Sequence, residues 1–205
     1  MTTYLEDFNR VFIGTTAPNG ATYVNNGGWS ISSNRGLSAT NYSWDTLVYE
    51  HGLTNPTIEV TPVATDIDDY WGIVIRYTDV NNFIMLNISS SDNYISIFRR
   101  EAGFDYNVSG NGVGPFAGLA YWNIGVSGPY PLKVYVVGDD FLIYANDVYV
   151  GTGTSSFLSG STYAGIGAYN ASLFDNFSIY TEDVVPPEEP TTTSTDGGWG
   201  FIPLI

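Results

Sequence analysis

Residues 71–100 read WGIVIRYTDVNNFIMLNISSSDNYISIFRR, three alternating runs of apolar and polar residues separated by two polar turns. Alternation with a period of two is the pattern of a pleated strand. In the first run, one face is expected to hold Trp71, Ile73, Ile75 and Tyr77. In the third run, Ile95 and Ile97 are expected on one face, and Tyr94, Ser96 and Phe98 on the other. The Asn, Asp and Ser residues between the runs favour turns. The stretch therefore predicts a meander of three antiparallel strands.

The rest of the chain repeats this pattern, and no segment shows a sustained helical period. Further strands are expected within 4–12, 36–40, 44–51, 56–65, 132–150, 163–169 and 174–180. Pro62 lacks a backbone donor and predicts a bulge or an edge position in its strand. Residues 101–131, rich in Gly and aromatic residues, are expected to form a long loop and a candidate binding surface. The fold class predicted is all-β.

Three segments differ in composition. Residues 1–181 are expected to form one domain, 182–196 a linker rich in Pro, Glu and Thr, and 197–205 (GGWGFIPLI) an apolar segment. Because a polar linker separates this segment from the domain, we expect it to dock on another structural protein of a larger assembly. The docking residues predicted are Trp199, Phe201, Ile202, Leu204 and Ile205. A tail that folds back onto its own domain is the alternative.

Charge and composition exclude several classes of function. With 21 acidic and 6 basic side chains the formal net charge is -15, which disfavours nucleic acid and anionic membranes as partners. No segment approaches the roughly 20 apolar residues of a membrane helix. The chain has no Cys, which removes disulfides and thiol catalysis. Residues 1–7 lack the features of a signal peptide, so a position on a virion surface, or outside a cell by another route, is expected.

The order of these strands resembles the concanavalin A-like lectin/glucanase superfamily, above all its laminin-G-like and related carbohydrate-binding branches. The resemblance covers about residues 4–180 and rests on WGIVIRYTDVNNFIMLNI (71–88), LKVYVVGDDFLIYANDVYVG (132–151), YAGIGAY (163–169) and FDNFSIY (174–180), which follow an early acidic strand with a Phe. It implies a two-sheet antiparallel jelly-roll sandwich whose concave sheet or rim loops often bind sugars, sometimes with calcium. The fold does not define a function, because it also carries enzymes and structural modules.

Candidate sites follow from residue chemistry. A retaining glucanase of this superfamily carries a Glu-x-Asp-x-x-Glu run, which this sequence lacks. A Ser-His-Asp site would have to use His51, the only histidine, and the sequence has no Gly-x-Ser-x-Gly elbow to present the serine. We therefore predict that the protein is not an enzyme. Aromatic and planar polar side chains suit sugar binding, and the candidates are Trp122, Tyr121, Tyr106, Asn123 and Arg76. Calcium prefers carboxylate oxygens, and the candidate ligands are Asp66, Asp68, Asp69, Asp7 and Asp175.

The leading hypothesis is a non-enzymatic, virion-associated module (a decoration, fibre or tail protein of a virus or phage) that is anchored by its C-terminal segment and presents a glycan-binding outer surface. The first alternative is a free carbohydrate-binding lectin whose tail serves to form a homo-oligomer. The second is a divergent glycosidase, which would need two carboxylates facing each other across a groove.

Overall fold

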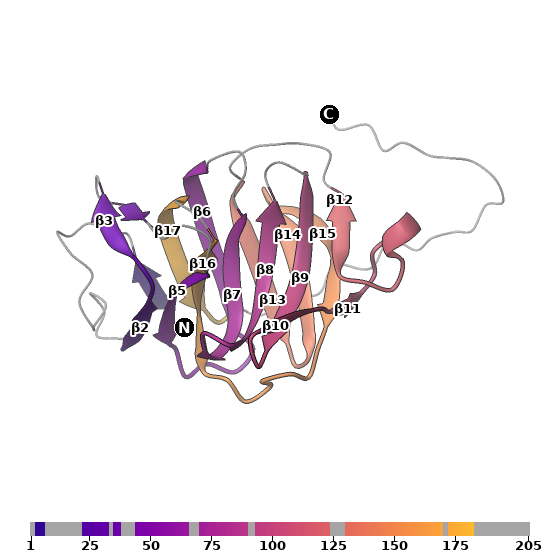
Figure 1. The fold of residues 1–205 in the computed structure, drawn as a ribbon, viewed down its shortest axis with the longest axis horizontal. Helices are drawn as coiled ribbons and strands as arrows, with labels where there is room; N and C mark the ends of the chain where they lie inside the picture. Colours follow the sequence, from indigo (N-terminus) through magenta and orange to yellow (C-terminus); the bar gives the residue numbers. More distant parts are fainter. Residues whose placement is uncertain are drawn as a thin grey trace.

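The chain forms two antiparallel β-sheets that pack face to face (Figure 1). The computed structural model describes residues 3–6, 22–32, 35–37, 44–65, 70–89, 93–123, 130–169 and 172–182. Within these ranges the only helical element is the short 3-10 helix η1 (Gly114–Phe116), and no helix there has the length and apolar character needed to cross a membrane. The all-β, two-sheet sandwich predicted from the sequence is confirmed.

Sheet I has the strand order β11-β15-β14-β13-β6-β17-β4-β3, and β1 pairs with β17 outside this path. Its strands are β1 (Thr3–Glu6), β3 (Ser30–Ser32), β4 (Arg35–Leu37), β6 (Thr57–Thr65), β11 (Ser109–Gly110), β13 (Leu132–Val137), β14 (Asp140–Ala145), β15 (Val148–Thr154) and β17 (Ser172–Tyr180). The register of β6 with β17 shifts between Pro62 and Ala64, so the irregularity predicted at Pro62 is present.

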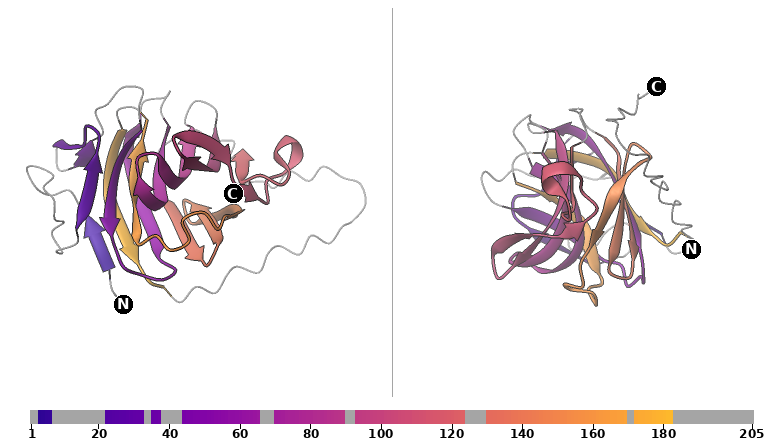
Figure 2. Two further views of the ribbon diagram at one scale, coloured as in Figure 1. Left: turned by 60° about the horizontal axis from the view of Figure 1, so that its bottom comes forward. Right: turned by 90° about the vertical axis from the view of Figure 1, so that its right-hand side faces the viewer.

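Sheet II has the order β10-β9-β8-β7-β16-β5-β2, and β12 pairs with β9. Two further views of the ribbon show the two layers of the sandwich (Figure 2). Its strands are β2 (Tyr23–Asn26), β5 (Asp45–Glu50), β7 (Tyr70–Asp79), β8 (Asn82–Ser89), β9 (Tyr94–Glu101), β10 (Phe104–Asn107), β12 (Tyr121–Asn123) and β16 (Tyr163–Ala168). The predicted meander is β7–β8–β9. The predicted loop at 101–131 is wrong for its described part, because residues 104–123 form β10, β11, η1 and β12.

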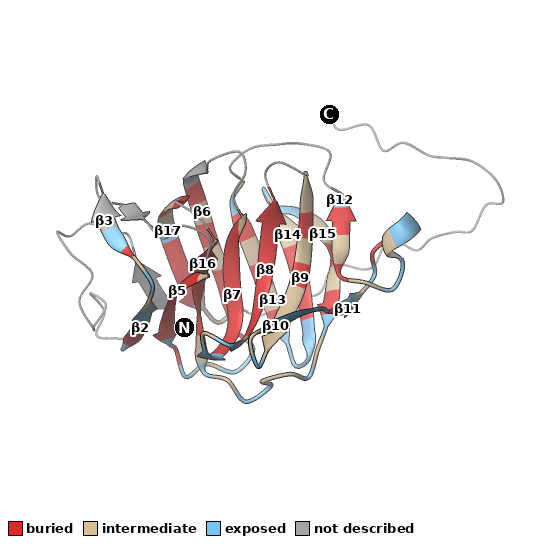
Figure 3. Cartoon of the chain, viewed as in Figure 1, coloured by how far each residue is buried: buried red, intermediate tan, exposed pale blue. Residues whose placement is uncertain are grey.

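The core lies between the sheets. Buried residues are concentrated in strands such as β7, β8 and β16 (Figure 3). Trp71 of sheet II lies 6.0 Å from Phe174 of sheet I, measured between ring centroids, and Tyr49 stacks on Phe177 at 5.1 Å. These four side chains are almost fully buried. Burial of a large apolar side chain contributes roughly 1.5–3 kcal/mol, so this contact between strands distant in sequence stabilises the sandwich.

Alternation along β7 is interrupted at Arg76. The register with β8 shifts between Val74 and Arg76, which marks a β-bulge. Ile75 belongs to the core between the sheets, but Tyr77 packs with Val74 and Phe83 on the opposite face. The predicted placement of Tyr77 beside Ile75 is therefore wrong, because the extra residue at the bulge reverses the faces beyond it.

The predicted linker and docking segment lie outside the described residues, apart from Glu182. This holds for Trp199, Phe201, Ile202, Leu204 and Ile205, so their docking role stays a prediction.

Candidate functional site

The outer face of sheet II carries a second apolar cluster. Val48, Val74 and Met85 alternate with residues of the main core, so their side chains point away from sheet I. They are nevertheless fully buried. Trp44, Phe98 and Tyr163 pack against this cluster. Aromatic side chains therefore cover part of the outer face of sheet II, which is not an open polar surface.

Two of these aromatic residues, Trp44 and Phe98, line a groove of about 410 Å³. Its walls consist of Trp44, Tyr70, Asn87, Tyr94, Ser96, Phe98, Asp105 and Tyr169. Antiparallel register explains part of the grouping, because Asn87 lies opposite Ser96 and Met85 lies opposite Phe98 on neighbouring strands. Trp44 approaches Phe98 at 5.1 Å and Tyr169 at 5.5 Å between ring centroids. The groove thus combines residues from β7, β8, β9 and β10 with residues that flank β5 and β16.

Asn87 is the unusual polar group of the groove. The residue is only 4% exposed, and its Oδ1 has no hydrogen-bond partner among the described residues. A buried amide oxygen without a partner costs about 1–3 kcal/mol. The oxygen itself has almost no accessible surface, so a ligand hydroxyl reaches it only if the amide turns toward the groove.

Two titratable groups of the groove are shifted by their surroundings. Burial raises the pKa of the Tyr94 phenol, and its hydrogen bond with Tyr70 raises that pKa further. Tyr94 therefore stays neutral at physiological pH. Burial raises the pKa of Asp105, while the nearby Arg100 guanidinium, 3.5 Å from Asp105 Oδ1, lowers it. The groove accordingly presents the neutral phenol of Tyr94 and the carboxyl group of Asp105 beside the Arg100 guanidinium.

Two of the sugar-binding residues predicted from the sequence lie next to this groove. Tyr121 stacks on Tyr94 at 4.5 Å and on Phe116 at 3.8 Å, measured between ring centroids. Since two rings cannot occupy the same face, both faces of Tyr121 are covered, and it extends the aromatic wall without offering a free face. Asn123 is exposed and lies opposite Tyr94 in the pairing of β12 with β9.

The other three predicted residues lie elsewhere. Trp122 is only 7% exposed because it lies opposite the core residue Ile95, and its Nε1 donates to Asn111 Oδ1 at 3.1 Å. Arg76 is 4% exposed and is directed by the bulge toward backbone carbonyls at another site. Tyr106 is 46% exposed, beside the Arg99 guanidinium at 5.4 Å. The five candidates therefore do not share one surface, because strand alternation and the bulge send Trp122 and Arg76 inward.

The predicted metal ligands are mostly outside the described residues. This applies to Asp7, Asp66, Asp68 and Asp69. Asp175 is described on β17, where its Oδ1 accepts a hydrogen bond from the Asn176 backbone N–H at 2.8 Å. Within the described ranges no three His, Asp or Glu side chains are grouped as metal ligands. Calcium binding stays a prediction.

The sequence contained a partial indication of the groove residues that were not predicted as sugar-binding. Tyr94, Ser96 and Phe98 were correctly predicted to face away from Ile95 and Ile97. Asn87 is a polar residue within the otherwise apolar run FIMLNI, which was a sign of an unusual position. Trp44 and Tyr169 had no such signal, because they are brought together only by the pairing of β5 with β16.

The sequence matches no protein-family model and no curated protein. Solved structures do resemble the fold. The carbohydrate-binding module CBM66 from Bacillus subtilis gives a TM-score of 0.62 at 18% identity, covering 77% of this chain and 95% of the module. A β-glucanase from Bacillus licheniformis gives 0.59 at 11% identity, covering 89% of this chain and 99% of the enzyme.

A GH43 protein from Bacillus licheniformis gives a TM-score of 0.63 at 17% identity, covering 86% of this chain but only 39% of that protein, so the similarity is confined to a part of it. At these identities the likeness concerns the fold alone. It supports the two-sheet antiparallel jelly-roll sandwich predicted from the sequence.

Proposed function

We propose that this chain is a non-catalytic glycan-binding module whose binding site is the aromatic groove on sheet II. The observation that carries the proposal is the aromatic-walled groove, whose lining includes Asn87, a buried amide with an unpartnered Oδ1. Sugars present C–H faces that pack on aromatic rings and hydroxyl groups that donate hydrogen bonds, so they complement both features. The fold likeness to a carbohydrate-binding module and a β-glucanase supports a ligand of this class.

The single carboxylate among the described residues of the groove supports binding without catalysis. Glycoside hydrolysis uses two carboxyl groups, about 5 Å apart in retaining enzymes and about 6.5–9.5 Å apart in inverting ones. Among the described residues that line the groove, Asp105 is the one carboxylate, and it forms an ion pair with Arg100. The described lining of the groove therefore offers no second carboxyl group for either mechanism.

The charge of the chain favours a neutral glycan. The net charge is -15, and the carboxylate of Asp105 lies in the groove itself. Uronic acid or sulfated chains would be repelled by both. Neutral glucans, xylans and mannans are therefore the ligands to test first.

The decisive variant is Asn87→Leu, which replaces the unpartnered amide by an apolar side chain of similar size. We expect at least about tenfold weaker binding to a neutral polysaccharide, equivalent to about 1.4 kcal/mol, with no loss of thermal stability. Affinity electrophoresis against neutral glucan, xylan and mannan, with alginate and pectate as anionic comparisons, measures the affinity.

Tyr106→Ala is the matched control, because Tyr106 is an exposed aromatic residue outside the groove lining. Its affinity should equal that of the unmodified chain. If Asn87→Leu keeps its affinity and Tyr106→Ala loses it, the binding site lies at β10, and its assignment to the groove is overturned. Absence of binding to every neutral polysaccharide would overturn the glycan proposal itself.

The finer hypothesis, that the module belongs to a virus or phage particle and attaches through residues 197–205, rests on the sequence alone. It is tested by co-sedimentation of the full chain, and of a chain ending at Thr181, with particles from the source. Sedimentation of the full chain only would support anchoring. Equal behaviour of the two would favour the alternative of a free lectin if glycan binding is retained.

A further inference from the structure

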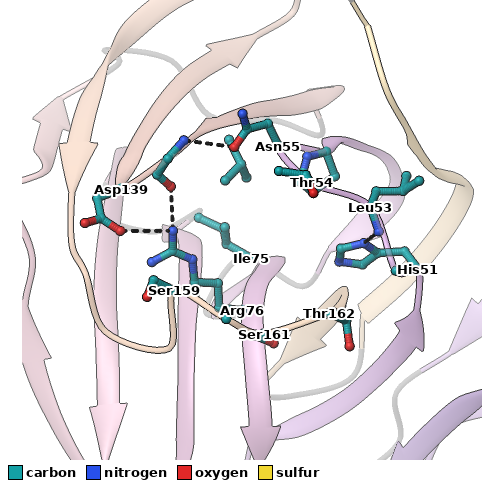
Figure 4. Close-up of a pocket in the computed structure, with 15 residues that line it drawn as sticks. His51, Leu53, Thr54, Asn55, Ile75, Arg76, Asp139, Ser159, Ser161 and Thr162 are labelled. Atoms are coloured by element: carbon teal, nitrogen blue, oxygen red, sulfur yellow. Dashed lines mark hydrogen bonds and ion pairs between the residues drawn. The ribbon is translucent and has the colours of Figure 1, made fainter.

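A second cavity, of about 340 Å³, is separate from the groove. It lies where the segment 51–56, the bulge of β7, the turn after β13 and the loop 159–162 meet (Figure 4). None of its lining residues is shared with the groove. Its volume is at the lower end of the range for small-molecule sites, so it fits one small ring and not a chain.

His51 supplies an unused hydrogen-bond donor to this cavity. The residue is 3% exposed, and its Nδ1 accepts the Leu53 backbone N–H at 3.0 Å. In a neutral imidazole the proton then resides on Nε2. No described residue accepts a hydrogen bond from Nε2. Burial lowers the pKa of His51 to about 4, so the ring is a neutral donor at physiological pH.

Arg76 does not make the cavity an anion site. Its Nη1 donates to the carbonyls of Ser155 and Phe157 at 2.7 and 3.0 Å, and its Nη2 donates to the carbonyl of Gly138 at 2.6 Å. The Oδ1 of Asp139 lies 3.5 Å from Nη2. The four terminal N–H groups are thus directed at protein oxygens, and no terminal N–H is left for an anionic ligand.

The remaining groups around the cavity suit a neutral, hydroxyl-rich molecule. The Asp139 side chain is 47% exposed and can accept hydrogen bonds from hydroxyl groups. Figure 4 shows His51 on one side of the cavity and Arg76 with Asp139 on the other. Leu53, Ile75 and Val136 add apolar surface for C–H groups.

We infer that this cavity is a second binding site, which takes one neutral sugar ring or a cyclic polyol of similar size. The Nε2–H of His51 donates to a ligand oxygen, and the Asp139 carboxylate accepts from a ligand hydroxyl. The site works independently of the groove, because the two share no residue. Its ligand is either a free sugar or a single unit at the end of a glycan.

The test is titration of the isotope-labelled full chain with neutral monosaccharides, their methyl glycosides, inositol, glucuronate and phosphate. Amide signals of Gly52, Gly138 and Gly160 report on the cavity, and those of Asn87 and Ser96 report on the groove. We expect saturable shifts of the three glycines with at least one neutral sugar or inositol at millimolar concentration. Equal response to the methyl glycoside would identify a unit of a chain, and response to the unmodified sugar only would identify a free sugar.

Two variants test the residues. His51→Asn keeps a side-chain acceptor for the Leu53 N–H but removes the Nε2 donor, and at least tenfold weaker binding is expected. Gly160→Tyr adds a side chain at the cavity lining, where a Cβ meets nothing within 4 Å, so the fold should tolerate it while binding is lost. Asn87→Leu should leave this binding unchanged.

Three results would overturn the inference. One is absence of glycine shifts with all neutral compounds. Another is a response to phosphate or glucuronate in place of the neutral compounds. The third is unchanged affinity in both His51→Asn and Gly160→Tyr. Because the groove amides are followed in the same spectra, failure of this site and failure of the groove proposal are observed separately.

Discussion

Acid should weaken this fold through His51. Burial lowers the pKa of the folded-state imidazole from its ordinary value of 6.5 to about 4. Between these two pH values the unfolded chain holds a proton that the folded chain does not. The contribution of neutral His51 to stability is therefore complete above pH 6.5 and is lost as the pH falls toward 4.

The magnitude follows from the same difference. At about 1.4 kcal/mol for each pH unit, a gap of about 2.5 units corresponds to about 3 kcal/mol. His51→Asn is the matched variant, because Asn does not titrate and its Oδ1 can accept the Leu53 N–H in the same local turn. The carboxylates are common to both chains, so their effects cancel in the difference.

The assay is denaturant unfolding of both chains at several pH values from 7 to 4. The free energy of unfolding of the unmodified chain should fall by about 3 kcal/mol more than that of His51→Asn over this range. Parallel curves for the two chains would refute the reasoning, because they would mean that the imidazole becomes protonated without loss of the fold.

Further predictions concern packing and charge. Arg76→Leu removes the donors of three backbone carbonyls and should lower the free energy of unfolding by on the order of 3 kcal/mol, measured by denaturant titration. Gly151→Ala should lower it by about 1–3 kcal/mol, because a Cβ there would lie 2.2 Å from the Trp122 ring. Gly160→Ala is the control, because a Cβ there meets nothing within 4 Å, and it should change the free energy of unfolding by less than about 0.5 kcal/mol. Equal melting temperatures for the two alanine variants would contradict the close packing of Gly151 against Trp122. Glycan binding in the groove should be insensitive to salt between low and physiological ionic strength, and calorimetry that finds a strong salt dependence would indicate a charged ligand.

Local patterns in the sequence predicted the strands and many of their faces. The pairing of β7, β8 and β9 agrees with the expected meander, and Ile95 and Ile97 point into the core as predicted. This succeeds because the side-chain direction of a strand alternates with each residue and needs no knowledge of distant contacts. The same rule also identified Tyr94 and Phe98 as residues of the opposite face.

The sugar-binding candidates show where local patterns fail. Trp122 and Arg76 were chosen for their chemistry, but both are buried. The direction of Trp122 depends on its pairing with Ile95, 27 positions earlier in the chain, and that of Arg76 depends on a bulge without a marker such as Gly or Pro.

By itself, the sequence determined the fold class, the meander and the acidic surface charge, because composition and period-two alternation are local properties of the chain. Only the tertiary structure decided which outer face becomes a groove, since Trp44, Asn87 and Tyr169 meet through the pairing of β5, β16, β7 and β8. It also brought His51 to the cavity beside Arg76. Both sites depend on strands that are distant in sequence, and the register of such strands is set by the packing of the whole sandwich.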